Sequence, residues 1–413
     1  MRIVELVVPR RLGLEFRTLL SASWITNAGD GLALAASPLL VASQTHDPFL
    51  VALAPLLQQL PWLLFGLYAG AVADRVDRRL LVVGANLARA FFLAVLLVFL
   101  VTGHVNVAVV LAAAFAFGTA EVFVDTTTST LTPMLVAKPD LGIANSRIYA
   151  GFLTVNQLAG PPVGAALFAL GMAWPFAGQL VCVLLGALLV SRLHLPAHGR
   201  QPDERTHLRT DIAEGLRWLW RSPPVRTLAL VIVTFNITYG AAISVLVLYA
   251  TQHLDMGEVG FGLLTTASAV GGLIGTTAYG WLERHVPLGT LMKTCLVLEV
   301  FFHLALALAT EPWQAMAALF GFGCYAFVWG TLSMSVRQRA VPQELQGRVG
   351  SVYLVGVFGG IVAGSFLGGL IAREWGLTAP FWFGFVGTGL FLTAIWPQLK
   401  LIVHADQEAT EAG

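Results

Sequence analysis

Apolar segments long enough to cross a bilayer recur along the whole 413-residue chain. A membrane-spanning helix needs about 20 apolar residues, and a helix satisfies its backbone polar groups internally where no water is available. We interpret the pattern as twelve spans, at residues 15–43, 49–73, 80–102, 105–135, 145–170, 174–193, 225–251, 258–284, 288–309, 313–338, 347–371 and 377–398. The predicted fold class is an all-α membrane protein with twelve transmembrane helices in two six-helix halves.

The composition excludes an ordinary soluble domain. The chain is 57% hydrophobic and 11% charged, whereas soluble domains average about 45–50% apolar and about 25% charged residues. The cysteines Cys182, Cys295 and Cys324 each lie inside an apolar run, without the close spacing of a metal site. We therefore expect buried thiols, no metal and no cofactor.

A single long polar stretch, 194–224, separates the two halves. The predicted domains are an N-terminal six-helix half at 1–193, a cytoplasmic linker at 194–224, and a C-terminal half with a short tail at 225–413. Within the linker, Leu208, Ile212, Leu216 and Leu219 recur at helical spacing, flanked by Trp and Arg. This pattern predicts an amphipathic helix along the membrane surface; a helix that binds a partner is the alternative.

The basic residues orient the chain. Of its 24 Lys and Arg residues, all except Arg373 fall at the termini, in the linker or at connectors on the same side, with Arg89 counted at the base of the third span. Because cytoplasmic loops carry the excess of Lys and Arg, both termini are predicted to be cytoplasmic. We expect a multi-pass protein of the cell inner (plasma) membrane.

The connector between the second and third spans is unusually charged. Its sequence, "GAVADRVDRR" at 70–79, resembles motif A of the major facilitator superfamily, G-x-x-x-D-R-x-G-R-R/K. The matching residues are Gly70, Asp74, Arg75, Arg78 and Arg79, while Asp77 replaces the second glycine. The chain thus resembles this superfamily, in a branch of drug and siderophore exporters similar to enterobactin exporters and macrolide efflux proteins.

The resemblance implies a role for this connector as a conformational latch. Asp74 would face the start of the eleventh helix, which carries Arg348, and Arg78 would pair with Asp125 low on the fourth helix. Such a latch stabilises one conformation and opens in the other. The alternative is that the connector charges only fix the topology.

Four carboxylates lie inside spans: Asp30, Glu121, Asp125 and Glu299. An ionised carboxylate at a helix centre costs about 2.5–3.5 kcal/mol on insertion scales, so each needs a partner, water or a proton. Asp30 lies between two glycines in "GDG", which weaken the helix and permit close approach. We assign Asp30 as a substrate-cation or proton site; a structural polar contact to a neighbouring helix is the alternative.

The other three acids receive different assignments. Glu121 and Asp125 are four residues apart and share a helix face, where repulsion favours the protonated form of one of them. Glu121 is deeper and is the proton-coupling candidate, whereas Asp125 is assigned to the latch, with Arg78 or Arg147 as its partner. For Glu299 we predict a structural pair with His303 at i+4, because the ninth helix is peripheral in the facilitator fold.

The fifth span contains "NQLAGPPVGAAL", in which Gly160, Pro161 and Gly164 resemble the core of motif C of antiporters, with Ala165 in place of its final glycine. This resemblance favours export and a fifth helix that bends during gating; a simple packing motif is the alternative.

The superfamily lines its cavity from helices 1, 4, 7 and 10, helped by 2, 5, 8 and 11. The implied lining residues are Asn27, Gln58, Asn156, Gln157, Asn236, Tyr239, Tyr325 and Trp329.

Together these features predict a secondary transporter that exports an amphipathic small molecule (a drug, antibiotic or siderophore) by alternating access, with proton antiport. The alternative is a facilitator that imports a small nutrient or metabolite. Metalloprotease, serine-hydrolase and nucleotide-loop motifs are missing from the sequence, so we do not expect an enzyme. The expected partners are a small-molecule substrate, protons and the lipid bilayer, with no nucleic acid, and we expect a monomer.

Overall fold

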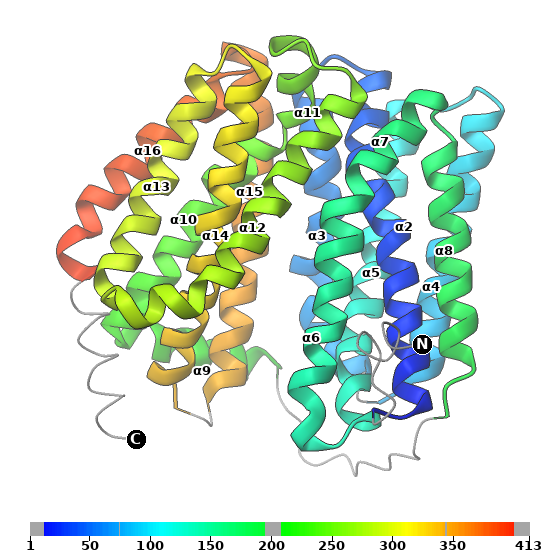
Figure 1. Cartoon of the computed structure of the whole chain (residues 1–413), viewed down its shortest axis with the longest axis horizontal. Helices are drawn as coiled ribbons and strands as arrows, with labels where there is room; N and C mark the ends of the chain where they lie inside the picture. The colour runs from blue at the N-terminus through cyan, green and yellow to red at the C-terminus, as the bar shows by residue number, and fades with distance from the viewer. Residues whose placement is uncertain (1–11, 74, 195–207, 343–344, 400–413) are drawn as a thin grey trace. The chain divides into compact units, whose positions relative to one another are not determined.

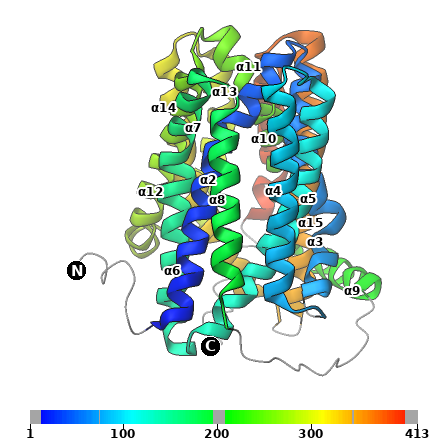
Figure 2. The same ribbon diagram turned by 90° about the vertical axis from the view of Figure 1, so that its right-hand side faces the viewer.

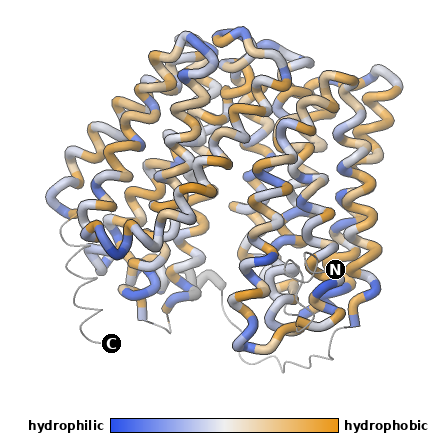
Figure 3. The backbone as a smooth tube through the Cα atoms, viewed as in Figure 1, coloured by the Kyte–Doolittle hydropathy of each residue, from blue (hydrophilic) through white to orange (hydrophobic). Residues whose placement is uncertain are grey.

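The computed structural model describes residues 12–73, 75–194, 208–342 and 345–399, and for 208–212 it describes the backbone alone. This part of the chain is 90% helical and contains no strands. Twelve of its helices are long and apolar enough to cross a membrane, which confirms the predicted fold class. Figure 3 shows the consequence in colour, with hydrophobic residues along the helices and hydrophilic segments mainly near their ends.

The first six spans run in chain order through short connectors (Figure 1). They are α2 (Leu14–Gln44), α3 (Pro48–Ala73), α4 (Arg78–Val101), α5 (Val107–Leu135), a composite fifth span, and α8 (Trp174–Ser191). The fifth span begins as the 3₁₀ turn η2 (Lys138–Asp140) and α6 (Leu141–Gly151), continues as the π-helix η3 (Phe152–Ala159) and ends as α7 (Gly160–Leu170). A π-helical insertion of this kind is frequent at functional sites.

The second six spans follow α9 (Leu208–Arg221). They are α10 (Pro223–Ile243), α12 (Glu258–His285), α13 (Leu288–Leu308), α14 (Pro312–Ala340), α15 (Gln346–Trp375) and α16 (Ala379–Ile395), with the short 3₁₀ helix η6 (Trp396–Gln398) at the end. The seventh span, predicted as continuous over 225–251, is interrupted after Ile243. It resumes as α11 (Leu246–Leu248) and the π-helix η4 (Tyr249–His253).

The described chain forms two compact units, each with its own pattern of helix contacts. The first contains residues up to 46, 57–199 and 256–266, and the second contains 47–56, 200–255 and 267 onward. In the first unit, α2 packs against α7 and α8, and α4 packs against α5 and α8 (Figure 2). In the second, α10 packs against α15 and α16, and α13 packs against α14 and α16. The first and third helices of each half therefore have equivalent neighbours, as expected of structural repeats.

The linker helix α9 packs against α10 and α15. Leu219 is buried with Val225, Val341 and Val349, whereas Leu216 is 48% exposed. Glu214 accepts a hydrogen bond of 2.7 Å from Arg348 on α15. The amphipathic helix exists, but the predicted apolar stripe is not uniform: Leu219 faces protein while Leu216 does not. Its position on a membrane surface stays a prediction.

Candidate functional site

The first candidate site is an ion pair between α2 and α4. Nη2 of Arg89 lies 2.5 Å from Oδ1 of Asp30, and the Arg89 side chain is only 1% exposed whereas that of Asp30 is 22% exposed. Truncating one partner of a buried pair costs about 3–5 kcal/mol, because the remaining charge is left uncompensated. Asp30 therefore has the fixed counter-charge that an acid inside a span requires.

Polar groups from neighbouring helices complete this pair. The side-chain amide of Gln179 on α8 donates to Oδ1 of Asp30 at 3.2 Å, and Nη1 of Arg89 donates to Asn86 at 3.3 Å. The guanidinium also lies over the Phe117 ring of α5, 4.5 Å from its centroid, which adds a cation–π interaction. Four helices of one unit thus converge on a single buried cation.

Glu121 and Asp125 on α5 belong to the same cluster. Both interact electrostatically with Arg89, and Gln58 of α3 is a polar neighbour of Glu121. Asp125 is exposed and Glu121 is partly buried. Three carboxylates of the first unit therefore share Arg89 as their basic neighbour among the described residues.

Small residues let the helices that carry this cluster approach closely. A Cβ added to Gly29 would lie 2.8 Å from Cβ of Cys182 on α8, and one added to Gly31 would lie 2.8 Å from the carbonyl oxygen of Asn156 in η3. On α7, a methyl group at Gly164 would collide with the backbone carbonyl of Leu32. The motif around Gly160, Pro161 and Gly164 therefore packs against α2; a role in gating stays a prediction.

Arg89 does not lie at the cytoplasmic base of the third span, where its inclusion among the connector charges puts it. It lies halfway along α4 and is buried. The Arg89 side chain lies inside a membrane span, so it does not indicate which side of the membrane is cytoplasmic. The signal was present in the sequence, because Arg89 falls inside the apolar segment 80–102.

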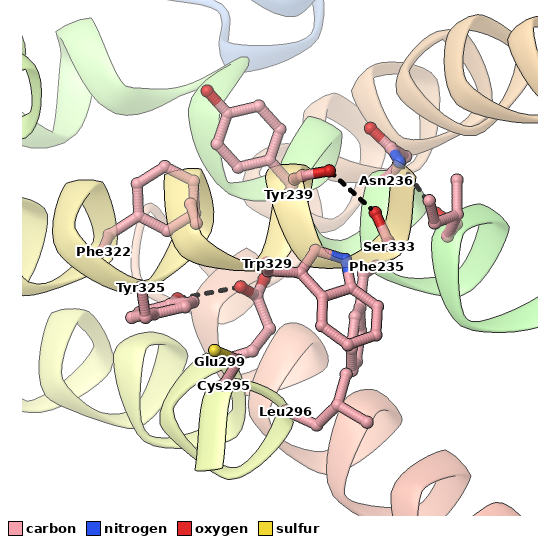
Figure 4. A pocket seen from close by; sticks show the side chains of 13 residues that line it. Phe235, Asn236, Tyr239, Cys295, Leu296, Glu299, Phe322, Tyr325, Trp329 and Ser333 are labelled. Atoms are coloured by element: carbon pink, nitrogen blue, oxygen red, sulfur yellow. Dashed lines mark hydrogen bonds between the residues drawn. The ribbon is translucent and has the colours of Figure 1, made fainter. Parts of the chain in front are cut away.

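A second candidate site lies in the second unit, between α10, α13 and α14 (Figure 4). It is a cavity of about 220 Å³ whose wall is mostly aromatic and apolar. The residues that line it are Ile232, Phe235, Asn236, Tyr239, Cys295, Leu296, Glu299, Phe322, Tyr325, Ala326, Trp329, Gly330 and Ser333. The rings of Tyr239 and Phe322 stack at 5.2 Å between centroids.

Glu299 is the acid in this wall. Its Oε2 accepts a 2.8 Å hydrogen bond from the hydroxyl of Tyr325, and its Oε1 lies 3.5 Å from Nε2 of the fully buried His303. The predicted contact between Glu299 and His303 is present. In addition, α13 contributes three residues to the cavity wall, so Glu299 also faces a cavity.

The predicted lining residues divide between the units. Asn236, Tyr239, Tyr325 and Trp329 line the cavity of the second unit, whereas Asn27, Gln58, Asn156 and Gln157 belong to the first. There, the side-chain amide of Asn156 donates to the backbone carbonyl of Asn27 at 3.4 Å and accepts from Gln157 at 2.7 Å. These amides contact one another and neighbouring backbone.

The charged connector is seen only in part, since Asp74 lies outside the described residues. Asp77 caps α4 by accepting a hydrogen bond from the amide of Leu80 at 3.1 Å, and Nη1 of Arg79 donates to the carbonyl of Leu193 at 3.1 Å. Arg75 is exposed, and a Cβ at Gly70 would make an ordinary contact with Thr126.

Arg78, which is expected to belong to the latch, contacts α3 and α5 in the structure. Nε of Arg78 donates to the carbonyl of Ala73 at 3.3 Å, and its Nη1 lies 3.1 Å from the sulfur of Met134. The basic neighbour of Asp125 is Arg89. The latch pair of Arg78 with Asp125 stays a prediction, since these contacts of Arg78 are with α3 and α5 and the link between Asp125 and Arg89 is electrostatic.

Comparisons with known proteins agree with this architecture. A family model described as "Transmembrane secretion effector" matches residues 9–411. The multidrug efflux pump Tap of Mycolicibacterium fortuitum is 30% identical over 388 residues, covering 88% of this chain and 90% of Tap. The enterobactin exporter EntS of Escherichia coli O6:K15:H31 is 26% identical over 409 residues, covering 96% and 95% of the two chains.

Solved structures share the fold at low identity. A bacterial homologue of the iron transporter ferroportin, in its inward-facing state, superposes with a TM-score of 0.73 at 15% identity, covering 95% of this chain and 98% of that one. The nucleoside transporter NupG gives a TM-score of 0.66 at 13% identity, covering 96% of this chain and 99% of NupG.

Proposed function

Because the chain belongs to the transmembrane secretion effector family of the major facilitator superfamily, we propose that it exports an amphipathic small molecule in exchange for protons, by alternating access. The chain is a multi-pass membrane transporter of the efflux type and not an enzyme. The names of its relatives, a multidrug pump and a siderophore exporter, support a drug, antibiotic or siderophore as substrate. The single observation that carries the proton coupling is the cluster around Arg89.

The charge balance of that cluster favours an exchangeable proton. If Asp30, Glu121 and Asp125 were all ionised, three negative charges would face the one positive charge of Arg89. Unit charges interact much more strongly in a protein interior than in water, so such an excess of negative charge is unfavourable. A proton or a cationic substrate relieves the excess, and binding of one can displace the other. Asp30 and Glu121 are the proposed coupling residues.

The charged connector is proposed as the conformational latch. The contacts of Arg78 and Arg79 tie the start of α4, capped by Asp77, to the end of α3, to α5 and to the segment after α8. Together with Asp74 and Arg75, which complete the motif, they would stabilise one state of the transport cycle. From the positive-inside rule, we propose that this connector and both termini are cytoplasmic. We further propose that the protein is a monomer in the plasma (inner) membrane.

Transport by the purified chain in proteoliposomes tests the proposal. An imposed pH gradient should drive movement of at least one of a panel of dyes, macrolides and catecholate siderophores. The variant Asp30→Asn should lose gradient-driven movement while substrate exchange without a gradient persists. Asp255→Asn is the matched control, because Asp255 is exposed and its φ of 52° suits Asn as well as Asp.

Two outcomes would overturn the proposal. If the gradient drives no panel member and Asp30→Asn has no effect, proton exchange is wrong. If cells that produce the protein accumulate more of a transported compound than cells with an empty vector, the direction is import and the export assignment is wrong.

A further inference from the structure

We infer that the cavity between α10, α13 and α14 is a binding subsite for the positively charged, aromatic end of an organic ligand, with Glu299 as its anionic contact. The inference deepens the proposed function and rests on it, since it names a chemical class of substrate. It concerns residues of the second unit alone.

The wall of the cavity provides what an organic cation needs. The rings of Phe235, Tyr239, Phe322, Tyr325 and Trp329 line it together with the Glu299 side chain. Faces of Trp, Tyr and Phe attract ammonium groups, and the attraction grows when the site is desolvated. Figure 4 shows these side chains with the carboxylate of Glu299 joined to Tyr325 by a hydrogen bond.

The carboxyl group of Glu299 contacts a phenol and an imidazole, and no guanidinium or ammonium group among the described residues. The phenol of Tyr325 orients Oε2 by donating a hydrogen bond of 2.8 Å, but a neutral donor leaves the charge in place. His303 is the basic side chain in contact with Glu299 among the described residues, at 3.5 Å from Oε1, and neither of its ring nitrogens has a hydrogen-bond partner. A carboxylate inside a span needs a partner, water or a proton, and a cationic ligand is a partner that this arrangement leaves room for.

The first unit provides the contrast. There the acid inside the first span is paired with Arg89 at 2.5 Å, and that carboxylate also accepts from Gln179. In the second unit, the acid in the wall has a phenol and an imidazole instead of a guanidinium. The second unit therefore keeps an acid available to a ligand.

The size of the cavity restricts what enters it. Pockets for drug-sized ligands measure about 300–1,000 Å³, whereas this cavity is about 220 Å³. It therefore accommodates one ring and its ammonium group, with the rest of a larger substrate outside. Benzyltrimethylammonium has this size and charge, and benzenesulfonate is an aromatic probe of similar size and opposite charge.

Equilibrium binding tests the inference without any gradient. The full chain in lipid nanodiscs is titrated with radiolabelled benzyltrimethylammonium, with unlabelled benzyltrimethylammonium or benzenesulfonate as competitor. We expect saturable binding that unlabelled cation displaces and benzenesulfonate does not. Glu299→Gln, which keeps the shape and removes the charge, should weaken binding by roughly tenfold or more, as expected for loss of a desolvated charge contact.

Two further variants make the result specific. Glu283→Gln is the control, because Glu283 is an exposed acid of the same unit that pairs with Arg339 at 3.8 Å, and its binding should match wild type. Trp329→Leu removes an aromatic face and keeps Glu299, so it should weaken binding severalfold. If Glu299→Gln does not fold, as judged by gel filtration and thermal unfolding, Trp329→Leu decides the test.

Three results would overturn the inference: no saturable binding to wild type, wild-type affinity in both Glu299→Gln and Trp329→Leu, or equal competition by benzenesulfonate. Because no gradient is applied, these results are independent of proton coupling. If the protein binds the cation through Glu299 but transports nothing in a pH gradient, the subsite is supported and the proposed proton antiport is wrong.

Discussion

Arg89 and Glu299 occupy the same position in the third helix of their halves. Each lies eleven residues beyond the first residue of its helix, which is Arg78 in α4 and Leu288 in α13. Arg89 reaches Asp30 on the first helix of its half, whereas Glu299 reaches Tyr325 on the fourth. The two halves thus place a buried ionisable side chain at an equivalent point, a base in the first half and an acid in the second.

The pair between Asp30 and Arg89 makes a prediction about stability. Arg89→Gln should lower the free energy of unfolding by about 3–5 kcal/mol, because it leaves buried carboxylates without their cation. In the double variant that carries both Arg89→Gln and Asp30→Asn, part of the lost free energy of unfolding should be recovered, since one uncompensated charge is then removed. Thermal and denaturant unfolding in detergent measure the effect. Arg373→Gln, which breaks an exposed pair with Asp47 at 3.7 Å, should cost at most about 1 kcal/mol. If the change in unfolding free energy of the double variant equalled the sum of the changes in the two single variants, the pairing of Asp30 with Arg89 would be contradicted.

The cluster also predicts proton release on substrate binding. A substrate that displaces the shared proton should acidify a weakly buffered protein solution, detected with a pH-sensitive dye. Glu121→Gln should abolish the release, because Glu121 is the partly buried acid beside Gln58, whereas Asp125→Asn should preserve most of it, since Asp125 is exposed. The release should fade at alkaline pH, where the proton is already lost. Undiminished release from Glu121→Gln would rule out this residue as the coupling acid.

Close packing of the fifth span on α2 makes Gly164 a sensitive position. Gly164→Ala places a methyl group against the backbone carbonyl of Leu32, and overpacking costs about 1–3 kcal/mol. Gly84→Ala in α4 is the matched control, because nothing lies within 4 Å of its added Cβ, and Ala should there stabilise the helix by about 0.5–1 kcal/mol. Opposite shifts in melting temperature would support the packing, and equal shifts would contradict it.

Variants of Arg348 and of its partner Glu214 can show whether Arg348 belongs to the latch or only holds α9 in place. Its partner Glu214 is 46% exposed, so Glu214→Gln should change stability by less than about 1 kcal/mol and leave transport near wild type. If Arg348 also serves the latch, Arg348→Gln should slow transport severalfold at equal stability. Initial rates in proteoliposomes provide the measurement. Identical rates for the two variants would limit Arg348 to holding α9.

The spans were predictable because hydropathy is a local property of about 20 consecutive residues, and all twelve are present. The interruption of the seventh span after Ile243 was not predictable, since no proline or charged residue marks it. The pairing of Arg89 with Asp30 joins residues 59 positions apart, and nothing local predicts it. Glu299 was correctly paired with His303 by its i+4 spacing, but its place in a cavity wall depends on how α13 packs against α14. Side-chain partners between helices are decided by packing.

The cluster around Arg89 has a consequence for biosynthesis. Asp30, Asn86, Phe117, Glu121 and Asp125 all precede the linker in the sequence, so each of these groups, which contact or neutralise the guanidinium, is translated before the second half begins. N-terminal domains generally fold first during synthesis. A nascent chain can therefore shield its most costly intramembrane charge while the ribosome is still producing the remaining six helices.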